Sequence, residues 1–227
     1  MYVMIPVFNF NHNVLSIDPS LNCSGYSVFL NGALREYGNI YFSSYVRKGE
    51  KKKTIGYKLY HIEKRLKEII EVNEIDLIVM EKYRVLLSNA KNNMKINTSC
   101  ETMKLLPMVR GIIRKVCFEN NIECAEIWDG EVKKILTGSG RADKSEVQSA
   151  VNSIYGISLS TKKDEDISDS IGVGFSFFKL QELRLLYSDN ISDAINFLNE
   201  YHNIKSKTQK SLISIGVDIN KWKSLMK

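Results

Sequence analysis

The sequence predicts an α/β fold, with a mixed sheet that begins as an antiparallel hairpin and carries packed helices. Short apolar runs of strand length open the chain, and helix-length segments with apolar residues three and four positions apart then alternate with strands. The length of 227 residues is enough for one sizeable domain with an appendage. A composition of 44% hydrophobic and 26% charged residues is typical of a globular protein.

Four strands and one helix are predicted in the first third of the chain. The strands are expected at 14–17, 25–30, 34–46 and 76–81. Asn31-Gly32 lies between the second and third strands and is a strong hairpin signal, because both residues tolerate the positive φ angles of a tight turn. Residues 54–73 are predicted to form a helix, since apolar side chains recur there at helical spacing. These are Ile55, Leu59, Ile62, Leu66, Ile69 and Ile70.

Helices dominate the remainder. Residues 82–97 are polar and basic without a clear period, so we expect a loop there. The following helix, over 98–120, contains Pro107, which should kink or restart it. Its apolar stripe consists of Met103, Leu106, Val109, Ile113 and Val116. A strand is expected next at 122–128, and then helices at 129–136, 143–155 and 164–187.

The sequence Ser188-Asp189-Asn190 divides the chain into a main domain over 1–187 and a basic extension over 188–227, helical or partly disordered. Residues 201–227 carry six lysines against the single acid Asp218, so most of the net charge of +6 lies there. The lysines are Lys205, Lys207, Lys210, Lys221, Lys223 and Lys227. Such a tail can bind phosphates, or it can simply be solvated.

Four carboxylates occur at the ends of apolar segments. Asp18 and Glu81 each close a strand-like run, and Asp166 and Asp169 open the last helix. Acids beside a core are costly unless a positive charge lies between them, and divalent cations prefer carboxylate oxygens. Residues three apart share one face of a helix, so Asp166 and Asp169 can both point inward. Converging acids of this kind suit a two-metal site for phosphodiester chemistry.

Each of these residues also has a structural interpretation. Asp18 and Glu81 can be strand-end acids in turns, and the run Asp164-Glu165-Asp166 can serve the N-terminal dipole of the helix. Asp164 is a possible substitute ligand. The four cysteines show no CxxC spacing and the three histidines lie far apart, which argues against zinc. No apolar run approaches the ~20 residues of a membrane span, and a signal peptide is not expected, so we predict a cytoplasmic protein.

The chain resembles RuvC-type Holliday-junction resolvases, and the resemblance covers about residues 14–180. Four stretches carry it in the order found in that family. They are Ile17-Asp18-Pro19-Ser20 with Gly25-Tyr26-Ser27-Val28, then Ile78-Val79-Met80-Glu81, then Val132-Lys133-Lys134 through Gln148, and finally Asp166-Ile167-Ser168-Asp169 through Val173. The resemblance implies an RNase H-like fold, with a three-strand meander leading a mixed central sheet and helices on both faces. Low proline content and compact size suit a phage or mobile element.

The resemblance also implies the chemistry. Two Mg²⁺ (or Mn²⁺) ions would be held by the four carboxylates, with Asp18 between them, and in-line attack would leave 5′-phosphate and 3′-hydroxyl ends. Lys144 matches the lysine of the family's site and would neutralise the attacked phosphate, although it can also be a plain surface lysine. Lys133 and Arg141 would contact DNA. After Glu81, where the family often offers an aromatic wedge, this chain has Tyr83 and Arg84 instead, so either could take that role.

The implied function is the resolution of four-way DNA junctions by paired nicks. Two symmetric cuts require two sites related by a two-fold axis, which favours a homodimer through the helix at 98–120, although its apolar stripe can equally be core. The alternatives are a monomeric nuclease that acts on flaps or forks, a branched-DNA-binding module without activity, and an actin-like ATPase. An actin-like ATPase would need a second phosphate-loop repeat, which this sequence lacks.

Overall fold

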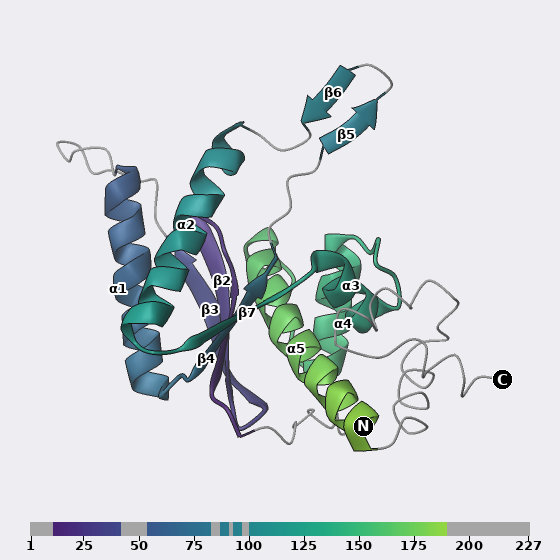
Figure 1. Ribbon diagram of the computed structural model, residues 1–227. Helices are drawn as coiled ribbons and strands as arrows, with labels where there is room; N and C mark the ends of the chain where they lie inside the picture. The colour runs from purple at the N-terminus through teal and green to yellow at the C-terminus, as the bar shows by residue number, and fades with distance from the viewer. Residues whose placement is uncertain (1–10, 42–53, 83–86, 91–92, 97–99, 190–227) are drawn as a thin grey trace.

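The computed structural model describes residues 11–41, 54–82, 87–90, 93–96 and 100–189 (Figure 1). Tyr83, Arg84 and nearly all of the predicted extension over 188–227 lie outside the described residues. Within them, no helix combines the length and the apolar character needed to cross a membrane.

Five strands form one mixed sheet in the order β3-β2-β1-β4-β7. Their bounds are Val14–Asp18 for β1, Cys23–Leu30 for β2, Ala33–Tyr41 for β3, Leu77–Glu81 for β4 and Glu123–Ile127 for β7. The first three strands form the predicted antiparallel meander, with positive φ angles at Asn31 and Gly32 in its turn. β4 and β7 then extend the sheet in parallel with β1, so three strands end at the same edge.

Helices cover both faces of this sheet, as predicted (Figure 1). One face carries α1 (Ile55–Asn73) and α2 (Cys100–Glu119). The other carries α3 (Asp129–Thr137), α4 (Lys144–Tyr155) and α5 (Glu165–Asp189), which follows a 3-10 turn at Lys162–Asp164. Thr54 caps α1 and Asp143 caps α4, each accepting a backbone N–H with its side chain.

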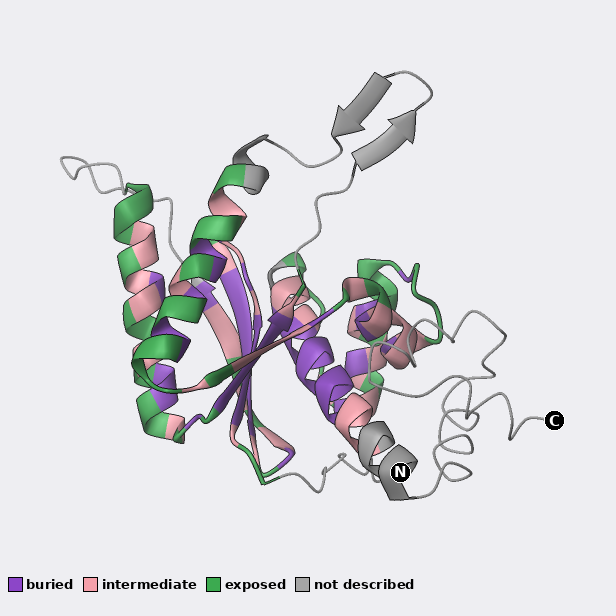
Figure 2. Cartoon of the chain, in the orientation of Figure 1, coloured by how far each residue is buried: buried purple, intermediate pink, exposed green. Residues whose placement is uncertain are grey.

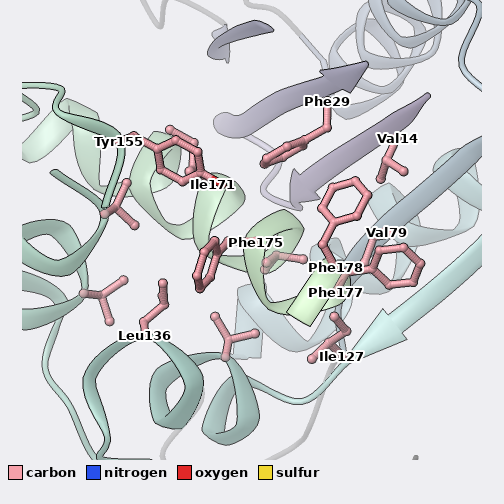
Figure 3. Packing of buried hydrophobic residues seen from close by; sticks show 14 of the residues in the cluster. Val14, Phe29, Val79, Ile127, Leu136, Tyr155, Ile171, Phe175, Phe177 and Phe178 are labelled. Carbon is pink, nitrogen blue, oxygen red and sulfur yellow. The ribbon is translucent and has the colours of Figure 1, made fainter. Parts of the chain in front are cut away.

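The alternation of β1 separates the two cores. Leu15 and Ile17 point toward α1 and α2, whereas Val14 packs with the residues of α5. Buried residues line the sheet and the sheet-facing side of α5 (Figure 2). On that side the aromatic rings of Phe29 and Phe178 meet with centroids 5.2 Å apart (Figure 3). By the same alternation, the last residues of β1 and β4 face the layer that contains α5.

Small residues bring α5 close to the sheet. The buried Ser16 hydroxyl on β1 donates to the main-chain carbonyl of Ser170. A Cβ at Gly174 would lie 2.2 Å from the ring of Phe29, and one at Gly172 would lie 2.7 Å from Leu136 on α3. Larger side chains at these positions would push α5 away from the sheet. The small residues therefore determine where the first turn of α5 lies relative to the strand ends.

One predicted feature differs from the structure. Residues 82–97 were expected to be a loop, yet β5 (Leu87–Ala90) and β6 (Asn93–Ile96) form a separate two-stranded hairpin within it. Each strand is only four residues long, which is too short for a strand to be predicted from its pattern of apolar and polar residues. Pro107 lies inside α2, which runs through it without a restart, so the expected kink is the alternative that stays a prediction. The predicted third strand, 34–46, is observed as far as Tyr41, and its last residues are not described.

Candidate active site

Asp18 and Glu81 come together through the parallel pairing of β1 with β4. Ile17 lies opposite Met80 in this register, so the next residue on each strand, Asp18 and Glu81, extends the same row. Both strands alternate in step, with Val14 and Leu77 or Val79 facing the α5 side. By the same period of two, the two carboxylates face α5 rather than the core between α1 and α2.

Gly25 lets the first turn of α5 reach these strand ends. It pairs with Asp18 across β1 and β2, and paired residues of an antiparallel ladder point to the same face. A Cβ at Gly25 would lie only 1.8 Å from the main-chain oxygen of Asp166 and 2.9 Å from the nitrogen of Ile167. The start of α5, with Asp166 and Asp169, is thus held against β2 beside Asp18. We call Asp18, Glu81, Asp166 and Asp169 the carboxylate cluster.

Lys144 adds a positive charge to this cluster from the first turn of α4. Its Nζ lies 3.5 Å from Oδ2 of Asp169 and 3.4 Å from Oε2 of Glu165, which also begins α5. The Asp143 cap positions it, because the carboxylate of Asp143 accepts the N–H of Glu146 and so fixes the helix start. Burial alone would lower the pKa of Lys144, but Asp169 and Glu165 outweigh it and raise that pKa.

The acids of the cluster share one electrostatic field. Burial raises the pKa of Asp18 well above its usual value, and the charges of Asp169, Glu81 and Asp166 raise it further, against the opposing effect of Lys144. Burial also raises the pKa of Asp169, although Lys144 pulls it down. Carboxylates that are half-removed from water and repel one another favour a bound proton or a bound cation.

The pKa of Glu81 is raised for the same reasons as that of Asp18, by burial and by neighbouring acids. Burial, Asp129 and Asp169 together raise its pKa to about 7, with Lys133 and Arg110 acting against the shift. Asp129 begins α3 and receives the Lys133 ammonium at 3.0 Å. Sequence analysis overlooked Asp129, since an acid at a helix start usually needs no other explanation.

Arg110 is a second residue that sequence analysis missed. It is buried on α2, and its guanidinium donates to the main-chain carbonyl of Glu81 and, at 2.6 Å, to the carboxylate of Glu126 on β7. Arg110 therefore ties α2 to the ends of β4 and β7 and holds the backbone of Glu81. The only sequence signal was an arginine next to the apolar stripe of α2, which would otherwise be placed at the surface.

The chemistry of this donor set fits hard divalent cations. Carboxylate oxygens are the ligands that Mg²⁺ and Mn²⁺ prefer, and the raised pKa values of Asp18, Glu81 and Asp169 indicate a deficit of positive charge. As the side chains stand in the described ranges, no three acidic, histidine or cysteine groups enclose an ion position. A divalent ion would offset the repulsion among these carboxylates.

Lys133, Arg141 and Asp164 are the other predicted site residues that the structure describes. Lys133 pairs with Asp129 as described, and Arg141 is exposed in the loop between α3 and α4. Asp164 does not join the cluster: its carboxylate accepts N–H groups of Ser160 and Thr161 and caps the 3-10 turn. Those hydrogen bonds lower the pKa of Asp164, so the capping interpretation holds for it.

Neutralising Glu81 should stabilise the metal-free protein at high pH. Its folded-state pKa of about 7 exceeds the value of 4.5 in an unfolded chain. The free energy of unfolding therefore falls as pH rises from about 4.5 to 7. In EDTA at pH 8, Glu81→Gln should raise the free energy of unfolding by about 2 kcal/mol, and by much less at pH 5. Urea titrations at both pH values measure this. The exposed Glu71→Gln on α1 is the control, and an equal gain at both pH values would contradict the expectation.

Comparison with known sequences identifies the family. The family described as crossover junction endodeoxyribonuclease RuvC matches residues 14–177. A relative of that name from Caldicellulosiruptor saccharolyticus is 31% identical over 182 residues, which cover 78% of this chain and 98% of the relative. Another, from Rhodopirellula baltica, is 29% identical over 164 residues, covering 70% of this chain and 82% of the relative.

Solved structures share the fold. Thermus thermophilus RuvC, determined in complex with a Holliday junction substrate, is similar with a TM-score of 0.55 and 19% identity, covering 73% of this chain and 92% of that one. The yeast mitochondrial Holliday junction resolvase has a TM-score of 0.54 at 11% identity, covering 85% and 86%. At such identities the likeness establishes the RNase H-like fold. The family match over 14–177 and the relative at 31% identity go further: this chain belongs to the RuvC family of crossover junction endodeoxyribonucleases.

Proposed function

We propose that this protein resolves four-way DNA junctions by two symmetric, metal-dependent nicks, one at each of two carboxylate clusters. The observation that carries the proposal is that acids from two strand ends and from the start of α5 lie close enough to act on one another electrostatically. Asp18 has its pKa raised by burial and by the three other acids of the cluster. A cluster of negative charges can approach polyanionic DNA only when cations offset those charges.

In this proposal Asp18, Glu81, Asp166 and Asp169 would hold two Mg²⁺ or Mn²⁺ ions. When bound, the ions supply an activated water and a counter-charge for the leaving 3′-oxygen. Asp18 and Glu81 contribute oxygens from rigid strand ends, and Asp166 and Asp169 contribute theirs from one helix face. Lys144, already oriented by Glu165 and Asp169, meets the charge that grows on the attacked phosphate.

We assign binding of the DNA backbone to residues around the cluster. Lys133 lies on α3, where its charge acts on Glu81, and Arg141 is exposed in the loop before α4. Tyr83 and Arg84 follow Glu81 in the sequence. The lysines of 201–227 provide further charge, since the rest of the chain is nearly neutral. We assign the enzyme to the places where it would meet branched DNA: the bacterial cytoplasm or nucleoid, or a virus-infected host cell.

The structure changes which surface a homodimer would use. Val109, Ile113 and Val116 of the predicted stripe are fully buried against the sheet and α1, so this part of the stripe is core. A dimer through α2 would instead bury its outward residues Met108 and Phe118, which are 45% and 87% exposed. The buried stripe is also the observation that favours the rival, a monomeric nuclease on flaps or forks.

A fixed four-way junction tests the function directly. The protein is incubated with Mg²⁺ and a junction labelled on each strand in turn, and the nicks are mapped on a denaturing gel. Symmetric nicks on opposite strands, with products that DNA ligase seals, are expected. Sedimentation with Phe118→Ser then tests the dimer surface. Preference for a flap substrate, or gapped products, would instead support the monomeric nuclease.

Loss of Lys144 should slow the chemical step more than it weakens binding. Its ammonium lies at the start of α5 beside Asp169, where it offsets negative charge that grows during attack. Lys144→Ala should reduce single-turnover cleavage about 10²-fold, the usual scale for one lost electrostatic group. Junction affinity, measured by gel shift, should change little. The nearby exposed Lys162→Ala is the control, and weak binding with normal cleavage at saturation would make Lys144 only a positioning contact.

A further inference from the structure

A tryptophan and a lysine lie side by side next to Glu81 without a role in the chemistry proposed above. Glu81 pairs with Ile127 in the parallel ladder of β4 and β7, so the next residues, Lys82 and Trp128, continue the same row past the sheet edge. The N–H of Lys82 donates to the carbonyl of Ile127 at 2.6 Å. The Lys82 ammonium lies 4.4 Å from the centre of the Trp128 ring.

The backbone of Trp128 is held firmly while its ring is presented to solvent. Its carbonyl accepts the N–H groups of Glu131 and Val132 at 2.9 and 3.0 Å, which makes it the N-cap residue of α3. Its own N–H donates to the Glu131 carboxylate at 3.4 Å. Even so, 38% of the residue is exposed. Ring and backbone together form a rigid platform at the edge of the carboxylate cluster.

Structural packing does not account for this pair. A lysine over an exposed aromatic ring stabilises a protein only weakly, and a tryptophan contributes most when it is buried. The same combination is effective toward nucleic acid, because an aromatic ring stacks on a base and an ammonium binds phosphate. Asp129, the next residue, lies close enough to Glu81 to help raise its pKa, which places the platform beside the site of cleavage.

We propose that Trp128 and Lys82 form a nucleotide-binding platform: the indole ring stacks on an unstacked base next to the scissile phosphate, and the Lys82 ammonium binds a flanking phosphate. This inference rests on the proposed function, because a branched junction supplies such bases where its arms separate. Stacking distinguishes bases by the size of their π-face, so the platform would also contribute to the sequence preference at the cut.

Tryptophan fluorescence tests the stacking contact. The sequence contains two tryptophans, so Trp222→Phe leaves Trp128 as the only one. In EDTA, titration of this protein with a fixed four-way junction should quench its emission over the same concentration range in which a gel shift reports binding. An unchanged emission spectrum on a bound junction would overturn the proposal, and it does so without any variant at Trp128.

Binding and cleavage of matched variants test the platform further. Trp128→Leu should weaken junction binding about 10-fold, the scale of one lost base-stacking contact, and Trp128→Phe should weaken it less. Lys82→Gln should flatten the slope of log affinity against log salt by about 0.9, as expected for one lost phosphate contact. The controls are Tyr60→Leu, an aromatic 61% exposed on α1, and Lys64→Gln on the same helix.

Junctions that differ only in the bases beside the cut complete the experiment. The parent should prefer some of them, and Trp128→Leu should cut all at similar rates. Equal affinity and an unchanged cleavage pattern in Trp128→Leu would overturn the platform even if the parent resolves junctions. A parent that binds and is quenched but does not cut would contradict the proposed function and leave the platform standing. A parent that neither binds nor cuts would overturn both.

Discussion

Replacement of Asp18 by asparagine is expected to abolish junction cleavage while junction binding remains nearly intact. Asp18 lies on the central strand of the sheet, and its pKa is raised by burial and by all three other acids of the carboxylate cluster. The amide removes the negative charge that a divalent cation requires, whereas affinity for DNA comes mainly from contacts with phosphates. The single-turnover rate should fall by at least about 10³-fold.

A second measurement separates loss of the metal site from loss of the fold. Mn²⁺ should raise the melting temperature of the parent, because a ligand that binds only the folded state stabilises it, and it should not do so in Asp18→Asn. Without metal the variant should be at least as stable as the parent, since a buried repulsion is gone. The control is Asp76→Asn, an exposed aspartate that pairs with His12 away from the cluster. Full cleavage by Asp18→Asn would end the two-metal proposal.

Replacement of Gly25 by alanine is expected to damage the site without touching any charged group. The added Cβ would lie 1.8 Å from the main-chain oxygen of Asp166 and 2.3 Å from its carbon. These are backbone atoms and cannot rotate away, so the start of α5 must shift from β2. We expect a loss of about 3 kcal/mol in the free energy of unfolding, at the upper end of overpacking effects. Cleavage should fall at least about 10²-fold, because small displacements of catalytic groups are costly.

The matched control for this change is Gly111→Ala. Gly111 lies on the exposed side of α2, and a Cβ there would meet no atom within 4 Å. Alanine has the higher helix propensity, so this variant should be more stable by about 0.5–1 kcal/mol. Urea titration and junction cleavage measure both proteins. A Gly25→Ala protein with normal stability and normal cleavage would show that the close approach of β2 to α5 is not needed to place Asp166 and Asp169.

The order of the elements could be predicted because it depends on local patterns. Asn31-Gly32 indicated the hairpin, and the spacing of Ile62, Leu66 and Ile69 indicated α1, whose buried side they form. The carboxylates could be found for the same reason, since each one marks the end of a strand or the start of a helix. Strands that are parallel neighbours end at one edge, so Asp18 and Glu81 had to lie close together once β1 and β4 were paired.

Contacts between distant segments decided the rest, because no period in the sequence encodes them. Arg110 reaches the backbone of Glu81 across 29 positions, and Lys144 meets Asp169 only because α4 and α5 pack together. Whether a residue such as Asp164 caps a turn or faces the cluster depends on which way the local backbone directs its carboxylate. The stripe of α2 could equally have been an interface, and burial of Val109, Ile113 and Val116 made it core.

The sequence by itself determined the α/β class, the meander, the order of the helices and the identity of the four acids, since periodicity and strand-end position are properties of neighbouring residues. Only the tertiary structure decided how those acids share a field, which lysines reach them, and that Trp128 stands exposed beside Glu81 with Lys82 over its ring. The physical reason is that pKa shifts, close backbone approaches and ring contacts depend on distances through space between residues far apart in the chain.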